Sequence, residues 1–239
     1  MSLKEQFILN FVEDNRWKYL VNGLKNTMII TILALLLGVV IGIVVAMIRS
    51  TYDKNREDFK RKGEFRYFFF SVLNFICKIY LTVIRGTPVV VQLLIAYFII
   101  FVSSNNGIMV AAIAFGINSG AYVAEILRGG IMSIDNGQFE ASRSLGFNYV
   151  QTMAYIIIPQ VFKTVLPTLL NEFIALIKET SIAGYVGIMD LTKGGDIIRG
   201  RTFSAYMPLF AVAAIYLIIV VFLTYVVGKL ERSLRKSER

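Results

Sequence analysis

The sequence alternates between long apolar runs and short polar stretches. The stretch from Thr27 to Met47 contains no charged residue and is long enough to cross about 30 Å of hydrocarbon as a helix. We therefore expect a first span from about Gly23 to Ile48. Later apolar runs predict further spans at Ile108–Leu127, Gln160–Ile177 and Tyr206–Gly228. This pattern is typical of an all-α integral membrane protein.

Residues 67–102 decide how many spans there are. Two apolar runs, Phe68–Ile84 and Val89–Val102, flank Arg85-Gly86-Thr87-Pro88. Each run alone is short for a crossing that takes about 20 residues, and proline can kink a membrane helix without ending it. We therefore expect one kinked helix here and five spans in the whole chain.

The distribution of basic residues supports five spans. One short stretch after the first span holds Arg49, Lys54, Arg56, Lys60, Arg61, Lys62 and Arg66. With five spans, this stretch shares one side of the membrane with the connection around Arg128, Arg143 and Lys163 and with the basic C-terminal tail, whereas six spans would separate them. Because cytoplasmic loops are enriched in Lys and Arg, we place this side in the cytoplasm and the N-terminus outside. We expect the basic stretch to be a solvated loop, with binding of anionic lipid as the alternative.

The chain divides into three parts by pattern. Apolar and charged side chains interleave at the N-terminus and Trp17 and Tyr19 follow, which is typical of a segment at the membrane interface. We expect an N-terminal interfacial segment, a transmembrane domain with a cytoplasmic connection, and a basic cytoplasmic tail, at residues 1–21, 22–230 (connection about 129–159) and 231–239. Residues 178–205 are too glycine-rich for a lipid-facing helix and are expected to be broken, partly external and packed against the core.

Composition narrows the functional classes. Of the 239 residues, 56% are hydrophobic and the mean hydropathy is +0.65, which excludes a soluble domain with an ordinary surface. The net charge of +9 comes from basic residues that lie between apolar runs, so membrane orientation explains it and no nucleic-acid partner is expected. Histidine is absent and Cys77 is the single cysteine, which excludes His-based catalysis, His metal sites and an intrachain disulfide. Without a phosphate-binding loop or a nucleophile elbow, we expect no catalytic residue, metal or cofactor, and any ATP hydrolysis must occur on another chain.

The connection between the third and fourth spans carries the clearest local signal. Glu140–Leu145 consists of good helix formers, Gly146 follows where a helix needs a left-handed terminator, and Asp135 and Asn136 are candidate N-caps. This predicts a helix of about two turns, followed by a second amphipathic run from Tyr149 to Ile158. So short a helix buries little surface alone, which favours binding by another protein over the alternative of an ordinary connector.

The same connection resembles the cytoplasmic loop signature of ABC importer permeases. Glu140-Ala141-Ser142, Gly146 and Ile156-Ile157-Ile158-Pro159 keep the spacing of that signature, with Ser142 in place of a second Ala and Ile158 in place of Leu. The resemblance implies that the short helix is a coupling helix that docks into a groove of the ATPase subunit. The coupling residues it implies are Gly137, Glu140, Ala141, Ser142, Gly146 and Pro159.

Other motifs resemble the polar amino acid branch of these permeases, the histidine, glutamine and arginine type. They are Arg85-Gly86-Thr87-Pro88 with Gln92, the run Asn118–Glu125, Arg128-Gly129-Gly130, Asn171-Glu172-Phe173 and Lys178-Glu179-Thr180-Ser181. The resemblance covers about residues 20–228. It implies a permease subunit in the bacterial cytoplasmic membrane that translocates polar amino acids by alternating access. Its implied partners are two ATPase subunits, a second permease subunit, identical or similar, and an extracytoplasmic amino-acid-binding protein.

A pathway for a zwitterion needs polar groups inside an apolar bundle. Glu125 and Glu172 can pair with an ammonium, and Gln92 and the amides near Gly86 can bind a carboxylate. The candidate pathway residues are Arg85, Thr87, Gln92, Asn118, Tyr122, Glu125 and Glu172.

Purely structural roles are the alternative for these residues. Glu125 can pair with Arg128, Glu172 can pair with Lys178, and Thr87 and Gln92 can make interhelical hydrogen bonds. The alternative function is a stand-alone secondary transporter or channel, which the few intramembrane acids and the lack of an internal repeat make less favourable.

Overall fold

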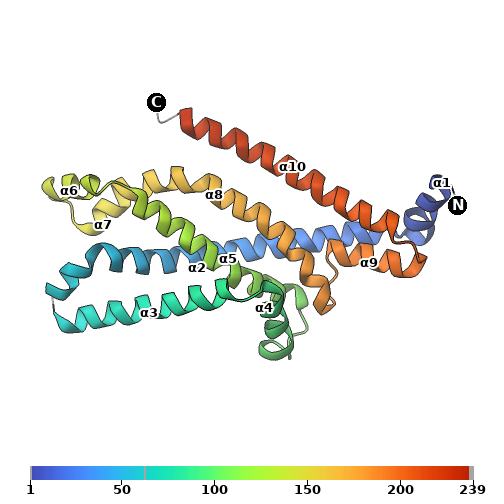
Figure 1. Ribbon diagram of the computed structural model, residues 1–239, viewed down its shortest axis with the longest axis horizontal. Coiled ribbons are helices and arrows are strands. Elements are labelled where there is room, and N and C mark those ends of the chain that lie inside the picture. The colour runs from blue at the N-terminus through green and yellow to red at the C-terminus, as the bar shows by residue number, and fades with distance from the viewer. Residues whose placement is uncertain (1, 62, 237–239) are drawn as a thin grey trace. The chain divides into compact units, whose positions relative to one another are not determined.

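The computed structural model describes residues 2–61 and 63–236, which are almost entirely helical (Figure 1). The long helices are α2 Trp17–Arg61, α3 Glu64–Gly86, α5 Gly107–Ser133, α8 Ile158–Glu179 and α10 Tyr206–Lys236. Five segments are long and apolar enough to cross a membrane: four lie within α2, α3, α5 and α10, and one, Tyr149–Val186, contains α8 and the short helical pieces on either side of it. The predicted all-α, five-span architecture is therefore confirmed. Lys62 and the tail residues 237–239 lie outside the described residues.

Shorter helical pieces connect the long helices. Before α2 lie α1 Leu3–Phe7, the π-helical turn η1 Ile8–Val12 and the 3₁₀ turn η2 Glu13–Asn15. Between the later spans lie α4 Val89–Ile95, the π-helical η3 Ala96–Ile100, α6 Asn136–Ser144, α7 Tyr149–Thr152, the π-helical η4 Met153–Ile157, the 3₁₀ helix η5 Thr180–Val186 and α9 Leu191–Thr202. The N-terminal segment is thus helical in three pieces, and its place at the membrane interface stays a prediction.

The chain forms two compact units that share the long helices. The first contains the chain up to Leu36, then Pro88–Gly116 and Phe173–Val227. The second contains Leu37–Thr87, Ile117–Glu172 and the chain from Gly228 onward. Each of α2, α5, α8 and α10 therefore contributes to both units.

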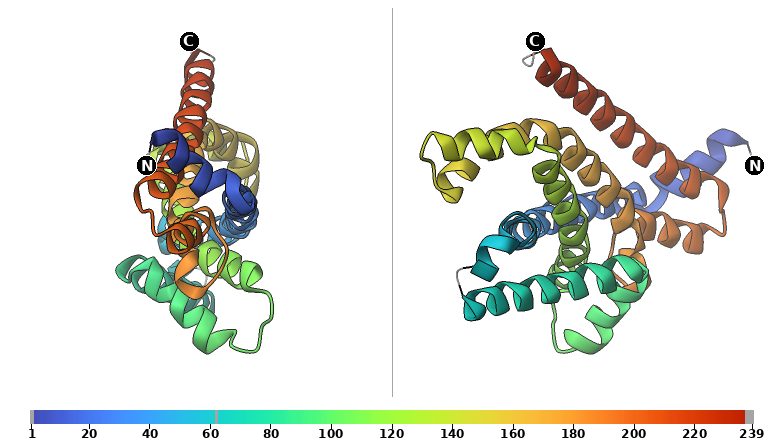
Figure 2. Two further views of the ribbon diagram at one scale, coloured as in Figure 1. Left: turned by 90° about the vertical axis from the view of Figure 1, so that its right-hand side faces the viewer. Right: turned by 60° about the vertical axis from the view of Figure 1, so that its left-hand side comes forward.

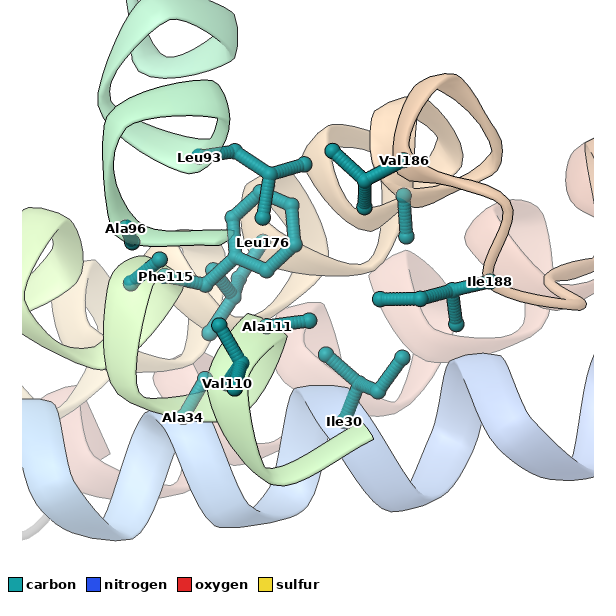
Figure 3. Packing of buried hydrophobic residues seen from close by; sticks show 12 residues of the cluster. Ile30, Ala34, Leu93, Ala96, Val110, Ala111, Phe115, Leu176, Val186 and Ile188 are labelled. Atoms are coloured by element: carbon teal, nitrogen blue, oxygen red, sulfur yellow. The ribbon is translucent and has the colours of Figure 1, made fainter. Parts of the chain in front are cut away.

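The core of the first unit packs around Phe115 of α5, which is fully buried (Figure 3). Leu93 of α4 and Leu176 of α8 lie against its ring, and Ala34 and Ala111 keep α2 and α5 close together. Small side chains at such contacts let membrane helices pack through backbone proximity.

The glycine-rich stretch of the first unit contains a helix that we did not predict. The stretch is broken as expected, by η5 and a left-handed Gly187, but α9 then runs for 12 residues. A Cβ added to Gly194 of α9 would overlap the backbone of Tyr19, and one added to Gly23 of α2 would overlap the backbone of Asp190. These glycines permit close packing between α9 and the start of α2, and this tertiary contact overrides their poor helix propensity.

Asp190 organises the start of α9. Its side chain has no exposed surface and accepts hydrogen bonds from the backbone N–H groups of Gly184, at 3.2 Å, and Lys193, at 2.5 Å. The Leu191 N–H donates to the hydroxyl of Thr27 at 3.1 Å. Burial raises the pKa of Asp190 to about 6, against the lowering effect of these backbone hydrogen bonds.

The basic stretch in the second unit is helical, which corrects the expectation of a solvated loop. Helix α2 continues to Arg61, with helical dihedrals interrupted at Asn55, and α3 begins at Glu64 after Gly63 with φ +128°. The rings of Phe59 and Phe70 stack at 4.4 Å between the two helices. Lys, Arg and Glu are good helix formers and the stretch 49–62 contains no proline or glycine, so its sequence gives the helix no reason to end before Gly63.

The kink at Arg85-Gly86-Thr87-Pro88 is a complete break between α3 and α4. Thr87 is extended, at φ −122° and ψ 146°, because the residue before a proline is pushed out of the helical region. The segment Phe65–Gly86 is long enough to be a span alone, while Val89–Ile100 is a shorter apolar helix. The count of five therefore holds, with the break dividing the region that we expected to form one kinked helix.

Candidate functional site

Helix α6 has the boundaries expected of the predicted coupling helix. Asp135 caps its start by accepting a hydrogen bond from the Gly137 N–H at 2.6 Å. Gly146 ends it in the left-handed region, at φ +85°, and the Phe147 N–H donates to the Ser142 carbonyl at 3.0 Å. This is the hydrogen-bond pattern of a glycine-terminated helix, so the predicted short helix and its terminator are confirmed.

The two faces of α6 differ in character. Phe139 is buried in a cluster with Met153 and Ile157, and Ser142 is also buried, with its hydroxyl donating to the Gln138 carbonyl at 2.6 Å. The outward face carries the exposed residues Gly137, Glu140, Ala141, Ser144 and Leu145. Leu145 is 76% exposed. Of the predicted coupling residues, Ser142 therefore faces inward while Glu140 and Ala141 face outward.

A second short helix, α7, follows α6 after a tight turn (Figure 2). The Asn148 side chain accepts from the Gln151 N–H at 3.0 Å, and the Gln151 side chain accepts from the Asn148 N–H at 3.0 Å. This capping box satisfies donors at the helix start. The chain then passes through the π-helical η4 into α8, and Pro159 is the second residue of α8. A wider turn just before a proline accommodates a residue that has no N–H to donate.

Glu125 of α5 is the centre of an ion-pair cluster within the second unit. Its Oε1 lies 2.7 Å from Arg49 Nη1, and its Oε2 lies 3.7 Å from Arg128 and 3.9 Å from Arg85. Arg128 also pairs with Asp53 at 3.2 Å. The structural alternative that we considered, a pair with Arg128, is thus present, but Arg49 makes the shorter contact. Arg85 comes to the same carboxylate and also lies over the ring of Tyr122 at 5.6 Å.

A cavity of about 430 Å³ opens beside this cluster. Its lining consists of Arg49, Lys78, Leu81, Thr82, Arg85, Gly86 and Glu125. Arg49, Lys78 and Thr82 were missed from the sequence. The spacing of Lys78, Thr82 and Arg85, which puts them on one face of α3, is a signal that would have found two of them.

The remaining pathway candidates are distributed over both units. In the second unit, Glu172 accepts a hydrogen bond from the Ser119 hydroxyl at 3.1 Å, and Asn118 is buried. The Thr87 hydroxyl donates to the Val83 carbonyl at 2.8 Å, inside its own helix end. Gln92 belongs to the first unit. The structure therefore brings together Arg85, Tyr122 and Glu125 of the seven predicted residues.

Comparison with protein families matches residues 65–236 to the family described as binding-protein-dependent transport system inner membrane component. The chain belongs to this family. The match covers the chain from α3 to α10 and includes α6, Arg85, Glu125 and Arg128, whereas Arg49 and Asp53 of the Glu125 cluster precede it. Membership implies a binding protein and an ATPase as partners, and together with the five apolar helices it indicates a multi-pass protein of the cytoplasmic membrane.

Curated relatives of this chain are named as permease proteins of transport systems. The putative glutamine transport system permease protein GlnP of Rickettsia felis is 36% identical over 165 residues, covering 68% of this chain and 76% of the relative. The glutamine transport system permease protein GlnP of Escherichia coli K12 is 38% identical over 168 residues, covering 69% of this chain and 77% of the relative.

Solved structures confirm the fold. The crystal structure of an amino acid ABC transporter with histidines matches at 34% identity with a TM-score of 0.78, covering 93% of this chain and 98% of that chain. The inward-facing MetNI methionine ABC transporter matches at 20% identity with a TM-score of 0.69 and shows the fold alone. The resemblance to ABC importer permeases is thus confirmed: the chain is a permease subunit, and ATP hydrolysis lies on a partner. None of these matches favours a stand-alone transporter or channel.

Proposed function

We propose that this permease imports polar amino acids across the cytoplasmic membrane by alternating access. The relatives named for glutamine and the structural match to an amino acid ABC transporter support this substrate class. In this proposal, the permease pairs with a second permease, identical or similar, and works with two ATPase subunits and an extracytoplasmic amino-acid-binding protein. The N-terminus lies outside and the basic C-terminal tail in the cytoplasm.

The outward face of α6 is the observation that carries the proposal. Ala141 is exposed and small, Leu145 is exposed and apolar, and no basic group of the described residues lies within 4.0 Å of the Glu140 carboxylate. A capped helix that shows such a face to solvent is suited to a groove in a partner. Closure of the ATPase subunits then moves α6, the bundle changes from inward-facing to outward-facing, and the binding protein unloads its amino acid.

The cluster around Glu125 supplies polar groups for a zwitterion on its way through the bundle. Glu125 Oε2 makes only the longer contacts with Arg85 and Arg128, so it is the oxygen that an ammonium can approach. Glu172, held by Ser119 on the same unit, is a second acidic group for the pathway. Both acids lie on spans whose remaining residues are mainly apolar, where ionisable residues mark transport pathways.

The coupling role is tested by Ala141→Trp and Gly146→Val. A bulky side chain at Ala141 blocks close approach of the partner, and a β-branched residue at φ +85° costs about 1 kcal/mol or more at the helix end. Both variants should reach the membrane in normal amounts, retain about tenfold less ATPase in a pull-down, and lose substrate-stimulated ATP hydrolysis in reconstituted vesicles.

Gly200→Val is the matched control for these variants. Gly200 lies in α9, is exposed, and an added Cβ there meets no atom within 4 Å. This variant should keep the ATPase and transport normally. If Ala141→Trp and Gly146→Val behave like the control, α6 is only a connector and the proposed coupling role is wrong.

A further inference from the structure

The cavity beside Glu125 carries more positive than negative charge. Three cations, Arg49, Lys78 and Arg85, stand on its lining against the single carboxylate of Glu125, so two positive charges remain unbalanced among the described residues that line it. The nearby Arg128 does not change this excess, because it pairs with Asp53 as well as with Glu125, and the negative charge of Asp53 balances the positive charge of Arg128.

Lys78 is the cation that the protein does not neutralise. In the part of the chain that the structure describes, no carboxylate lies within 4.0 Å of its ammonium, whereas Arg49 and Arg85 both reach Glu125. Lys78 is also exposed on a helix with the length and hydropathy of a membrane span. An ionised lysine in such a segment is unfavourable unless an anion or water meets it.

The position of Lys78 directs its charge toward the cavity. Lys78, Thr82 and Arg85 lie four and seven residues apart on α3, which places them on one helix face, and all three line the same space. An ammonium, a hydroxyl and a guanidinium along one wall can each donate hydrogen bonds to the oxygens of a carboxylate. The volume of about 430 Å³ is large enough for a small organic molecule.

We propose that Lys78 is a specificity-determining residue that binds, together with Arg85, the α-carboxylate of the amino acid in transit. This inference rests on the proposed function and adds a substrate class to it. Neutral and acidic amino acids are accepted, because they bring a net charge of zero or below into a cavity with excess positive charge. Cationic amino acids such as lysine are rejected, because like charges repel across the small distances of the cavity.

The test measures binding of radiolabelled L-glutamine to the permease with its ATPase partner in phosphatidylcholine nanodiscs, without the binding protein. L-glutamate, L-lysine and L-glutaminamide, which lacks the α-carboxylate, serve as competitors. In the wild type, glutamate should displace glutamine, while glutaminamide and lysine should not. Lys78→Gln should weaken glutamine binding about tenfold or more and should reduce the difference in affinity between glutamine and lysine. Lys78→Arg, which keeps the charge, should retain most of the affinity.

The control is Lys163→Gln, which removes an exposed lysine of α8 that does not line the cavity, and it should leave binding unchanged. Equal competition by glutamine and glutaminamide, or wild-type binding in Lys78→Gln, overturns the inference while the proposed function stands. If less anionic lipid co-purifies in detergent with Lys78→Gln than with the wild type, and glutamine binding in the nanodiscs is intact, Lys78 is assigned to a lipid phosphate and the inference is overturned. A wild-type complex that binds no amino acid overturns the inference, whereas the proposed function is overturned when vesicles that contain the complex and its binding protein take up no amino acid.

Discussion

Asp190 and Glu125 are two carboxylates that the protein holds in opposite ways. Asp190, in the first unit, has no exposed surface and its oxygens accept from two backbone N–H groups. Glu125, in the second unit, has a side chain that is 26% exposed, and its contacts are with the side chains of arginines beside a cavity. One carboxylate is fixed by the main chain, while the other has partners that can exchange.

This difference separates a structural acid from a functional one. Backbone donors cannot move without unfolding their helices, so the bonds of Asp190 hold the start of α9 against η5. Arginine side chains that are in contact with water can rotate away from a carboxylate at little cost to the stability of the fold, and the carboxylate can then bind a ligand. Burial alone would have ranked Asp190 as the more promising site, whereas the type of partner points to Glu125.

The largest expected effect is on stability, from Asp190→Ala. The change leaves the Gly184 and Lys193 N–H groups without their acceptor in a buried place and removes the cap of α9, at a cost of about 1–3 kcal/mol. The thermal midpoint of the purified protein in detergent should fall by several degrees. Asp190→Asn, which keeps an acceptor oxygen, should lose clearly less. Equal midpoints for Asp190→Ala and the wild type would show that the main-chain contacts contribute no stability.

Glu125→Gln should show the opposite pattern. Glutamine keeps an oxygen for Arg49 but removes the negative charge, so the fold should persist while the cavity becomes more positive. Uptake in reconstituted vesicles should fall about tenfold at matched amounts of folded permease, which corresponds to about 1.4 kcal/mol. A thermal midpoint that drops as far as that of Asp190→Ala, with uptake per folded molecule unchanged, would place Glu125 in the structural class.

The smallest expected effect is a dependence of the protein's stability on pH that arises from Asp190. The folded-state pKa of about 6 lies above the usual value near 3.9, so the folded protein binds a proton more tightly than the unfolded chain. Stability from this group should therefore be greatest below about pH 4 and should decrease as the pH rises to about 6. Thermal midpoints measured from about pH 4 to about pH 6.5 should fall more steeply for the wild type than for Asp190→Asn. Parallel slopes would assign the pH dependence to other groups.

Local signals in the sequence predicted the spans and the short helix α6. The apolar runs place the first residues of α5, α8 and α10 to within a few residues. Asp135 and Gly146 mark the two ends of α6, because capping residues act within one turn of a helix end. Tertiary effects caused the misses. Glycines that signal a broken segment instead pack α9 closely, and a charged stretch that indicates orientation also has the propensity to continue α2 to Arg61.

The site was less predictable, because its partners are far apart in the chain. Arg49 and Glu125 are separated by 76 residues, and nothing in the pattern around either one specifies the other. Glu172 meets Ser119, which belongs to the run Asn118–Glu125 and lies 53 residues earlier in the chain. Gln92 was grouped with Arg85 by closeness in sequence, but the break at Thr87 and Pro88 divides the chain between two units at that point.

The glycine contacts between α2 and α9 have a mechanical consequence. At Gly23 and Gly194 backbone meets backbone, with no side chain between that can rotate to absorb a displacement. The two segments therefore move together, because a displacement of one requires a displacement of the other. A movement of α9 thus moves the first turns of α2, which is the longest helix in the described chain.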